Sequence, residues 1–148
     1  MKENTDIWGP EISKKVKDGV NYISLTDIAK FYNSDSPDDV VIFWMSYRDS
    51  FYLYSLWEEL YNADFNSAES GRIKTDEVGS NAFYMTPSQW KKRTNAKGII
   101  PGSGRSGGGT FAHPDLAMDF SCWMDPAFKL RVIGEYQKMR ENELARTQ

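Results

Sequence analysis

The sequence predicts one α+β domain that is rich in helix and has a few short β-hairpins. Its length of 148 residues corresponds to one ordinary domain. Hydrophobic residues make up 40% of the chain and aromatic residues 14%, which is enough apolar material for a packed core. Helix-capping sequences alternate along the chain with short extended runs and turn sequences, and this alternation favours the α+β class.

The N-terminal region is expected to form a loose tail followed by a β-hairpin. Residues 1–11 form the tail, with Ile7 and Trp8 as its anchors. Extended patterns on either side flank Asp18-Gly19, which is typical of a type I′ turn because glycine tolerates a positive φ. We assign residues 12–142 to the domain and residues 143–148 to a polar C-terminal tail.

Three helices are expected between residues 24 and 66. Ser24 or Thr26 caps the first, which ends near Tyr32. Ser36-Pro37 begins the second, and Ser50 caps the third. The side chains expected on their inner faces are Val40, Val41, Trp44 and Tyr47, and then Leu53, Trp57 and Leu60.

The second half of the chain is expected to alternate loops, helices and short extended arms. Residues 67–80 are polar and indicate a loop, and residues 82–85 indicate a short strand. A capping box over residues 86–89 begins a helix that continues through Lys97 and stops at Gly98. Apolar arms at 99–101 and 110–112 flank a glycine-rich loop, and helices follow over 114–124 and from 126 to about 143.

Positive charge is concentrated in one segment of an otherwise acidic chain. The formal net charge is −3, which taken alone argues mildly against a nucleic-acid partner. The 37 residues between Glu77 and Asp115 contain no acid and five cations, namely Lys91, Lys92, Arg93, Lys97 and Arg105. The remaining 13 basic and 21 acidic residues sum to −8. We expect the cationic segment to form one continuous positive patch.

The glycine-rich loop over residues 102–109 has three competing interpretations. Its match to G-x-G-x-x-G is weak evidence for a nucleotide site, because a strand-to-helix context is missing and Gly108 stands where a Walker motif needs lysine. It could be a plain flexible hairpin tip. The third interpretation is a wing whose glycines let the backbone approach a phosphate strand, with Arg105 at the tip.

The helix before this loop supports the wing. With Trp90 facing the core, Ser88, Lys91, Lys92 and Asn95 point away from it. This face carries two cations and no acid, whereas an ordinary solvated face mixes both signs. A cationic helix followed by a glycine-rich hairpin is the layout of a winged helix-turn-helix DNA reader.

Other chemistry is less well supported by the sequence. His113 is expected to be a cap or packing residue and Cys122 a buried, inert thiol. With a single cysteine and a single histidine, no metal site is expected, and the default compartment is a reducing cytoplasm. No run is long enough to span a membrane. The carboxylates expected to be solvated are Asp38, Asp39, Glu58 and Glu59, and the aromatic residues expected in the core are Trp44, Tyr54 and Trp57.

An ordered set of motifs runs through most of the chain. In order, the motifs are residues 22–29, Trp44, residues 56–58 and 62–66, Phe83, Trp90, residues 94–99 and 104–117, Trp123-Met124 and the closing helix 126–138. With these motifs, over about residues 12 to 142, the chain resembles the KilA-N domain, a DNA-binding module of phage, bacterial and large DNA-virus proteins that is related to the fungal APSES domain.

The resemblance implies a winged helix-turn-helix-like fold and double-stranded DNA as the partner, without enzymatic activity, cofactor or small-molecule substrate. By position, helix 86–97 becomes the recognition helix and the loop 102–109 the wing. The implied DNA-contacting residues are Ser88, Lys91, Lys92, Asn95 and Lys97, with Ser103, Arg105 and Ser106 from the wing.

Two other functions remain open at this stage. Many tyrosine, tryptophan and phenylalanine side chains could serve a protein-interaction module, and the glycine loop could hold a phosphate substrate in an enzyme. Family members often carry a second, C-terminal domain, so the chain is expected to be either a fragment that lacks this domain or a stand-alone module, with a homodimer as an open alternative. A transcription regulator derived from a phage or mobile element fits the resemblance.

Overall fold

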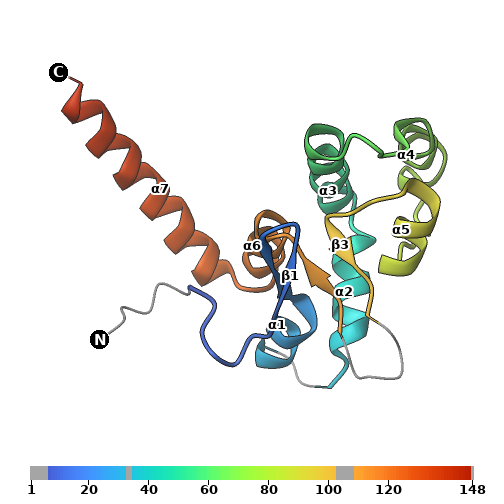
Figure 1. Ribbon diagram of the computed structural model, residues 1–148, viewed down its shortest axis with the longest axis horizontal. Coiled ribbons are helices and arrows are strands. Elements are labelled where there is room, and N and C mark those ends of the chain that lie inside the picture. Colours follow the sequence, from blue (N-terminus) through green and yellow to red (C-terminus); the bar gives the residue numbers. More distant parts are fainter. Residues whose placement is uncertain (1–6, 33–34, 103–108, 148) are drawn as a thin grey trace.

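The computed structural model describes residues 7–32, 35–102 and 109–147. Helices surround a small antiparallel sheet with strand order β1-β2-β4-β3, and a long C-terminal helix projects from the body (Figure 1). The elements in chain order are β1 (Lys14–Lys17), β2 (Val20–Ser24), α1 (Leu25–Tyr32), α2 (Pro37–Met45), α3 (Arg48–Tyr61), α4 (Ser67–Ile73), the π-helical segment η1 (Lys74–Val78), α5 (Pro87–Thr94), β3 (Ile99–Ile100), β4 (Phe111–Ala112), α6 (Pro114–Met124) and α7 (Pro126–Arg146). The α+β fold class is confirmed.

Two β-hairpins lie side by side in the sheet. In the first, Asp18 and Gly19 have φ values of 53° and 76°, as the type I′ turn requires. In the second, β3 pairs with β4 so that Ile99 lies opposite Ala112. The hairpins join through β2 and β4, where Ile23 also lies opposite Ala112. The sheet therefore brings the strands that flank the predicted wing next to the N-terminal hairpin.

Aromatic rings form the centre of the core. Trp44, Phe51, Tyr54, Trp90 and Phe120 are all fully buried. The Trp90 ring lies 4.9 Å from that of Tyr54 and 5.5 Å from that of Phe51, in edge-to-face geometry. This packing confirms that Trp44 and Tyr54 belong to the core, and it fixes α5 against α3.

Segment 67–80 is helical, and the predicted loop is wrong. Asn66 caps α4 by accepting the N–H of Glu69 at 3.0 Å, and η1 continues the coil to Val78. Most polar side chains of this segment face outward, while Ser70, Ile73 and Val78 are buried. The segment is polar because it is a surface helix, since only one narrow stripe of it reaches the core.

The predicted strand at residues 82–85 is also absent. The backbone N–H of Met85 donates to Ser46 Oγ at 2.9 Å, and Ser46 Oγ donates to the Met85 carbonyl at 3.3 Å. A side chain thus satisfies the backbone groups that a ladder would otherwise use. Residues 82–85 connect η1 to α5 without forming a strand.

Several helix boundaries and faces differ from those predicted. α3 begins at Arg48, so Ser50 is buried in the helix and does not cap it, and α7 continues to Arg146, past the expected end near 143. The exposed side chains that were expected on the inner faces are Tyr47, Leu53 and Leu60. In α3 the rings of Phe51 and Tyr54 decide which face turns inward, because they interlock with Trp90.

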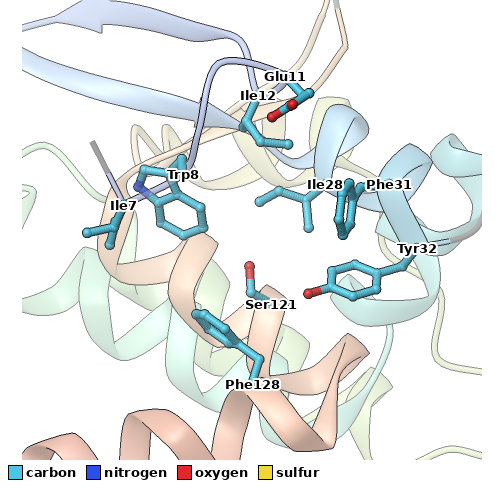
Figure 2. A pocket seen from close by; sticks show the side chains of 9 residues that line it. All are labelled: Ile7, Trp8, Glu11, Ile12, Ile28, Phe31, Tyr32, Ser121 and Phe128. Carbon is cyan, nitrogen blue, oxygen red and sulfur yellow. The ribbon is translucent and has the colours of Figure 1, made fainter. Parts of the chain in front are cut away.

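The base of α7 is fastened to the body. Tyr32 Oη donates to Asp125 at 2.9 Å, and Asp125 caps α7 by accepting the N–H of Ala127 at 3.0 Å. Phe128 points into a small apolar cavity of about 120 Å³ together with Ile28 and Trp8 (Figure 2). Trp8 therefore anchors the N-terminal segment as expected, whereas Ile7 stays exposed.

Within residues 7–32, 35–102 and 109–147, no helix combines the length and the apolar character needed to cross a membrane.

Candidate nucleic-acid interface

α5 is a short helix held firmly at its N-terminal end. Thr86 Oγ1 accepts the N–H of Gln89 at 3.1 Å, and Pro87 occupies the first turn, as the capping box predicts. With Trp90 buried, the side chains of Ser88, Lys91 and Lys92 are exposed. The helix itself lies at the edge of the body away from α7 (Figure 1). Since the sequence of α5 contains no acid, this outer face is cationic.

α5 ends at Thr94, three residues before the predicted end at Lys97. Asn95 adopts the left-handed conformation, with φ 58° and ψ 36°, and its Nδ2 donates to the Asp64 carbonyl at 3.1 Å. The side chain of Asn62 in turn donates to the Asn95 carbonyl at 3.0 Å. Asn95 is therefore not part of the helix face, and its amide group braces the turn that leaves α5.

The backbone at Lys97 and Gly98 is clamped by a buried carboxylate. Glu58, expected to be solvated, is fully buried. It accepts the N–H of Lys97 at 3.0 Å and that of Gly98 at 2.7 Å. The Lys97 carbonyl accepts from Tyr22 Oη at 3.1 Å. The clamp sets the path from α5 into β3 and so fixes where the Lys97 side chain begins.

Gly98 is required by this clamp for reasons of space. A Cβ atom at position 98 would lie 2.8 Å from the Glu58 carboxylate and 2.8 Å from the Trp57 ring. These distances are shorter than close-packed atoms tolerate. Gly98 therefore serves close approach, whereas Asn95 ends α5.

Lys17 joins the cationic residues of α5, although sequence reasoning missed it. Lys17 lies beside the turn of the first hairpin, and its Nζ donates to the Lys97 carbonyl at a distance of 3.4 Å. Burial lowers the pKa of the Lys17 ammonium; Lys91 and Lys97 act in the same direction, while Asp18 and Glu58 oppose them. Lys91 and Lys97 therefore lie close enough to Lys17 to act on its charge.

The base of the glycine-rich hairpin lies beside the start of α5. Ser88 lines a groove of about 250 Å³ together with Pro101, Gly102 and Gly109. The Thr110 N–H donates to Thr26 Oγ1 at 2.9 Å, which pins the hairpin to α1. The sequence-predicted wing residues Ser103, Arg105 and Ser106 lie outside the described residues, so the positive patch is described only on the helix side.

Arg93 does not contribute free positive charge. Its guanidinium donates to Glu69 at 3.1 Å and to both carboxylate oxygens of Glu77, which also binds Arg72. Hydrogen bonds from Arg72 and Arg93 lower the pKa of Glu69 from 4.5 to about 2. The acids of α4 and η1, placed in a loop by the sequence patterns, therefore neutralise one of the five cations of the segment.

His113 and Cys122, the residues most able to support catalysis, have structural surroundings instead. His113 Nδ1 accepts the N–H of Asp115 at 3.1 Å, and its ring lies 4.9 Å from that of Trp57, which confirms a cap and packing residue. Cys122 is half-buried rather than buried, because it lies beside the inward stripe of α6 and lines a hollow with Asp119 and Lys129. Burial raises the pKa of its thiol.

A cluster of metal-ligating side chains is absent from the described part of the chain. Residues 7–32, 35–102 and 109–147 contain no group of three or more histidine, cysteine, aspartate or glutamate side chains placed to hold a metal ion. Asp38, Asp39 and Glu59 are exposed, as expected. The apolar cavity in Figure 2 is smaller than pockets that enclose drug-sized ligands, which reach several hundred Å³.

Comparison with known proteins identifies the family of the chain. A curated relative, Protein kilA of Escherichia phage P1, is 37% identical over 74 residues, a match that covers 41% of this chain and 27% of that protein. The chain thus spans about a quarter of the length of the relative it matches. A comparison with solved structures found no significant match. Residues 11–142 match the KilA-N domain, which covers both hairpins, α5 and most of α7, and the chain belongs to the KilA-N domain family.

Proposed function

We propose that the chain is a non-enzymatic DNA-binding domain that places α5 and the glycine-rich hairpin against duplex DNA. The observation that carries the proposal is the cationic outer face of α5, flanked by Lys17 and Lys97 and by the base of the hairpin. Lysines in such a cluster neutralise phosphates, and the chain belongs to a family of DNA-binding domains.

The residues divide into two proposed tasks. Lys17, Lys91, Lys92 and Lys97 bind phosphates, and Ser88 donates to the backbone or to a base edge from the start of α5. From the hairpin, Ser103, Arg105 and Ser106 contact the DNA as a wing. Asn95 supports this surface by shaping the turn after α5 rather than by reading bases.

The biological setting belongs to the same proposal. A relative from a phage suggests a regulatory protein of phage or mobile-element origin that acts on DNA in the cytoplasm. Its net charge of −3 keeps the total field weak, so binding depends on the local cationic cluster. We therefore expect strong sensitivity to salt.

The test is a filter-binding titration with random duplex DNA across salt concentrations. Substituting Lys91→Ala or Lys92→Ala should weaken binding and lower the slope of log K against log salt by about one for each phosphate contact removed. Arg105→Ala should cost roughly 1–3 kcal/mol of binding while the melting temperature stays unchanged. Lys138→Ala, on the exposed face of α7, is the matched control and should leave the slope unchanged.

Protein binding is a second candidate function, favoured by one observation. Leu56 and Leu60 lie one turn apart on α3 and are 55% and 64% exposed, an apolar pair on the outer face of the body. If this surface is the main interface, DNA binding will be weak and insensitive to salt and to the lysine substitutions.

A further inference from the structure

α7 is a long helix without a packed face along most of its length. It comprises 21 residues, none of them buried, and runs away from the body on the side opposite α5 (Figure 1). Helices in proteins gain most of their stability from packing an amphipathic face against a partner. Beyond its base, the described part of the chain offers α7 no such partner.

The helix nevertheless has an apolar face. At 100° per residue, six apolar side chains lie within about 80° of the direction of Tyr136. They are Phe128, Val132, Ile133, Tyr136, Met139 and Leu144. Ile133, Tyr136 and Met139, in the middle of the helix, are 41%, 59% and 54% exposed. A stripe of this length on a projecting helix is suited to another helix.

The charges near the centre of this face are arranged symmetrically about Tyr136. Lys129 precedes Tyr136 by seven residues and Glu143 follows it by seven, so both point in nearly the same direction. If two copies of α7 pair antiparallel with Tyr136 at the axis, each Lys129 lies opposite the partner's Glu143. The same register places Ile133 opposite the partner's Met139, while Phe128 stays in the cavity at the base of α7.

The opposite orientation is disfavoured by the same charges. A parallel pair in register would set Lys129 against Lys129 and Glu143 against Glu143, and like charges facing each other destabilise a helix pair. Of the two in-register orientations, the antiparallel one therefore brings Lys129 and Glu143 together, with Arg140 of the same face opposite the partner's Val132. This complementarity identifies a second copy of the chain as the occupant of the apolar face.

We propose that α7 is a dimerisation helix that pairs antiparallel with α7 of a second copy, centred on Tyr136. The fastened base of α7, held by Tyr32 and Asp125, makes the helix a stiff arm. A helix of 21 residues is about 31 Å long, so the pairing holds two bodies apart at opposite ends of the helix pair. The proposal uses no feature of the DNA interface and stands independently of it.

Sedimentation equilibrium over a series of protein concentrations tests the pairing. We expect a species with twice the mass of the 17.0 kDa chain. Lys129→Glu alone, or Glu143→Lys alone, should raise the dissociation constant of the dimer at least about tenfold, because each dimer contains the altered pair twice. The double substitution Lys129→Glu with Glu143→Lys should restore dimerisation, since opposite charges face each other again.

The restoration separates the pairing from incidental effects. Arg140 donates to Glu143 at 2.8 Å within the helix, so Glu143→Lys also removes an intrahelical contact, which the double substitution does not rebuild. Lys138→Glu reverses a charge on the outer face of the same helix and should leave the dimer unchanged. Circular dichroism and thermal melting should show that every variant folds.

Three outcomes would overturn the proposal. One is a monomer at every concentration. Another is a dimer whose dissociation constant changes with neither Lys129→Glu nor Glu143→Lys, because its interface would then lie elsewhere or the helices would run parallel. The third is a double reversal that dimerises no better than the single ones.

Discussion

Replacing Glu58 by glutamine tests the clamp that positions the cationic residues after α5. The glutamine has the same shape, but only one of its two terminal groups accepts hydrogen bonds. Glu58 accepts from Asn62 Nδ2 at 2.9 Å and from Lys97 N–H at 3.0 Å through one oxygen, and from Gly98 N–H at 2.7 Å through the other. The amide group must therefore face at least one donor and leave it unsatisfied.

The expected loss of stability follows from these contacts. An unsatisfied buried donor costs roughly 1–3 kcal/mol, and the retained bonds weaken by about 1 kcal/mol each when the acceptor loses its charge. Removing a buried charge offsets part of this cost. We expect the free energy of unfolding of Glu58→Gln to fall by about 2 kcal/mol, which lowers the melting temperature by roughly 4–8 °C for a chain of this size.

Urea unfolding and thermal melting measure the effect, with Glu59→Gln as the matched control. Glu59 is the adjacent exposed carboxylate and should change stability by no more than about 0.5 kcal/mol. If Glu58→Gln is as stable as the parent chain, the carboxylate does not hold the backbone of Lys97 and Gly98 as described. The reasoning about how the cationic surface is positioned would then fail with it.

Three further predictions address other parts of the fold. Gly109→Ala would place Cβ 2.2 Å from Thr26 Oγ1 and should lower stability by about 1–3 kcal/mol, whereas Gly134→Ala, with open space around it, should raise the helicity of α7; equal melting of both variants would contradict this. Because the pKa of Glu69 is lowered to about 2, its ion pairs should stabilise the fold above pH 4.5 and be lost only as the pH falls through about 2; an NMR titration midpoint near 4.5 would refute the network. Burial raises the pKa of Cys122, so thiol reagents should label the folded chain more slowly than the unfolded chain at neutral pH, and equal rates would be the opposing result.

Local sequence patterns were sufficient wherever the structure depends on neighbouring residues. The Asp18-Gly19 turn, the Thr86 cap and the His113 cap all involve atoms within three residues of one another. The burial of Trp90 was also predictable, because Trp90 is the one large apolar side chain of a short cationic helix and therefore marks the face that packs on the core. These features determined the fold class and the presence of a cationic helix ahead of a hairpin.

One missed element had a readable local pattern. Asn66 followed by Glu69 three residues later is a capping-box pattern, which marks the start of α4. The polar composition of residues 67–80 outweighed it in our prediction. Surface helices with one narrow apolar stripe are easily mistaken for loops, since Ile73 and Val78 are too few to show a helical period.

The tertiary structure alone decided the charge of the candidate interface. Glu58 lies 39 and 40 residues from the backbone groups that it binds, and Arg93 lies 16 and 24 residues from its carboxylate partners. Lys17 reaches the Lys97 carbonyl from 80 residues away. No periodicity or capping pattern in the sequence encodes these long-range contacts, because they form only when separate elements pack together. The sequence determined that a cationic helix is followed in the chain by a glycine-rich segment. The packing determined which of the charges around that helix remain free at the surface.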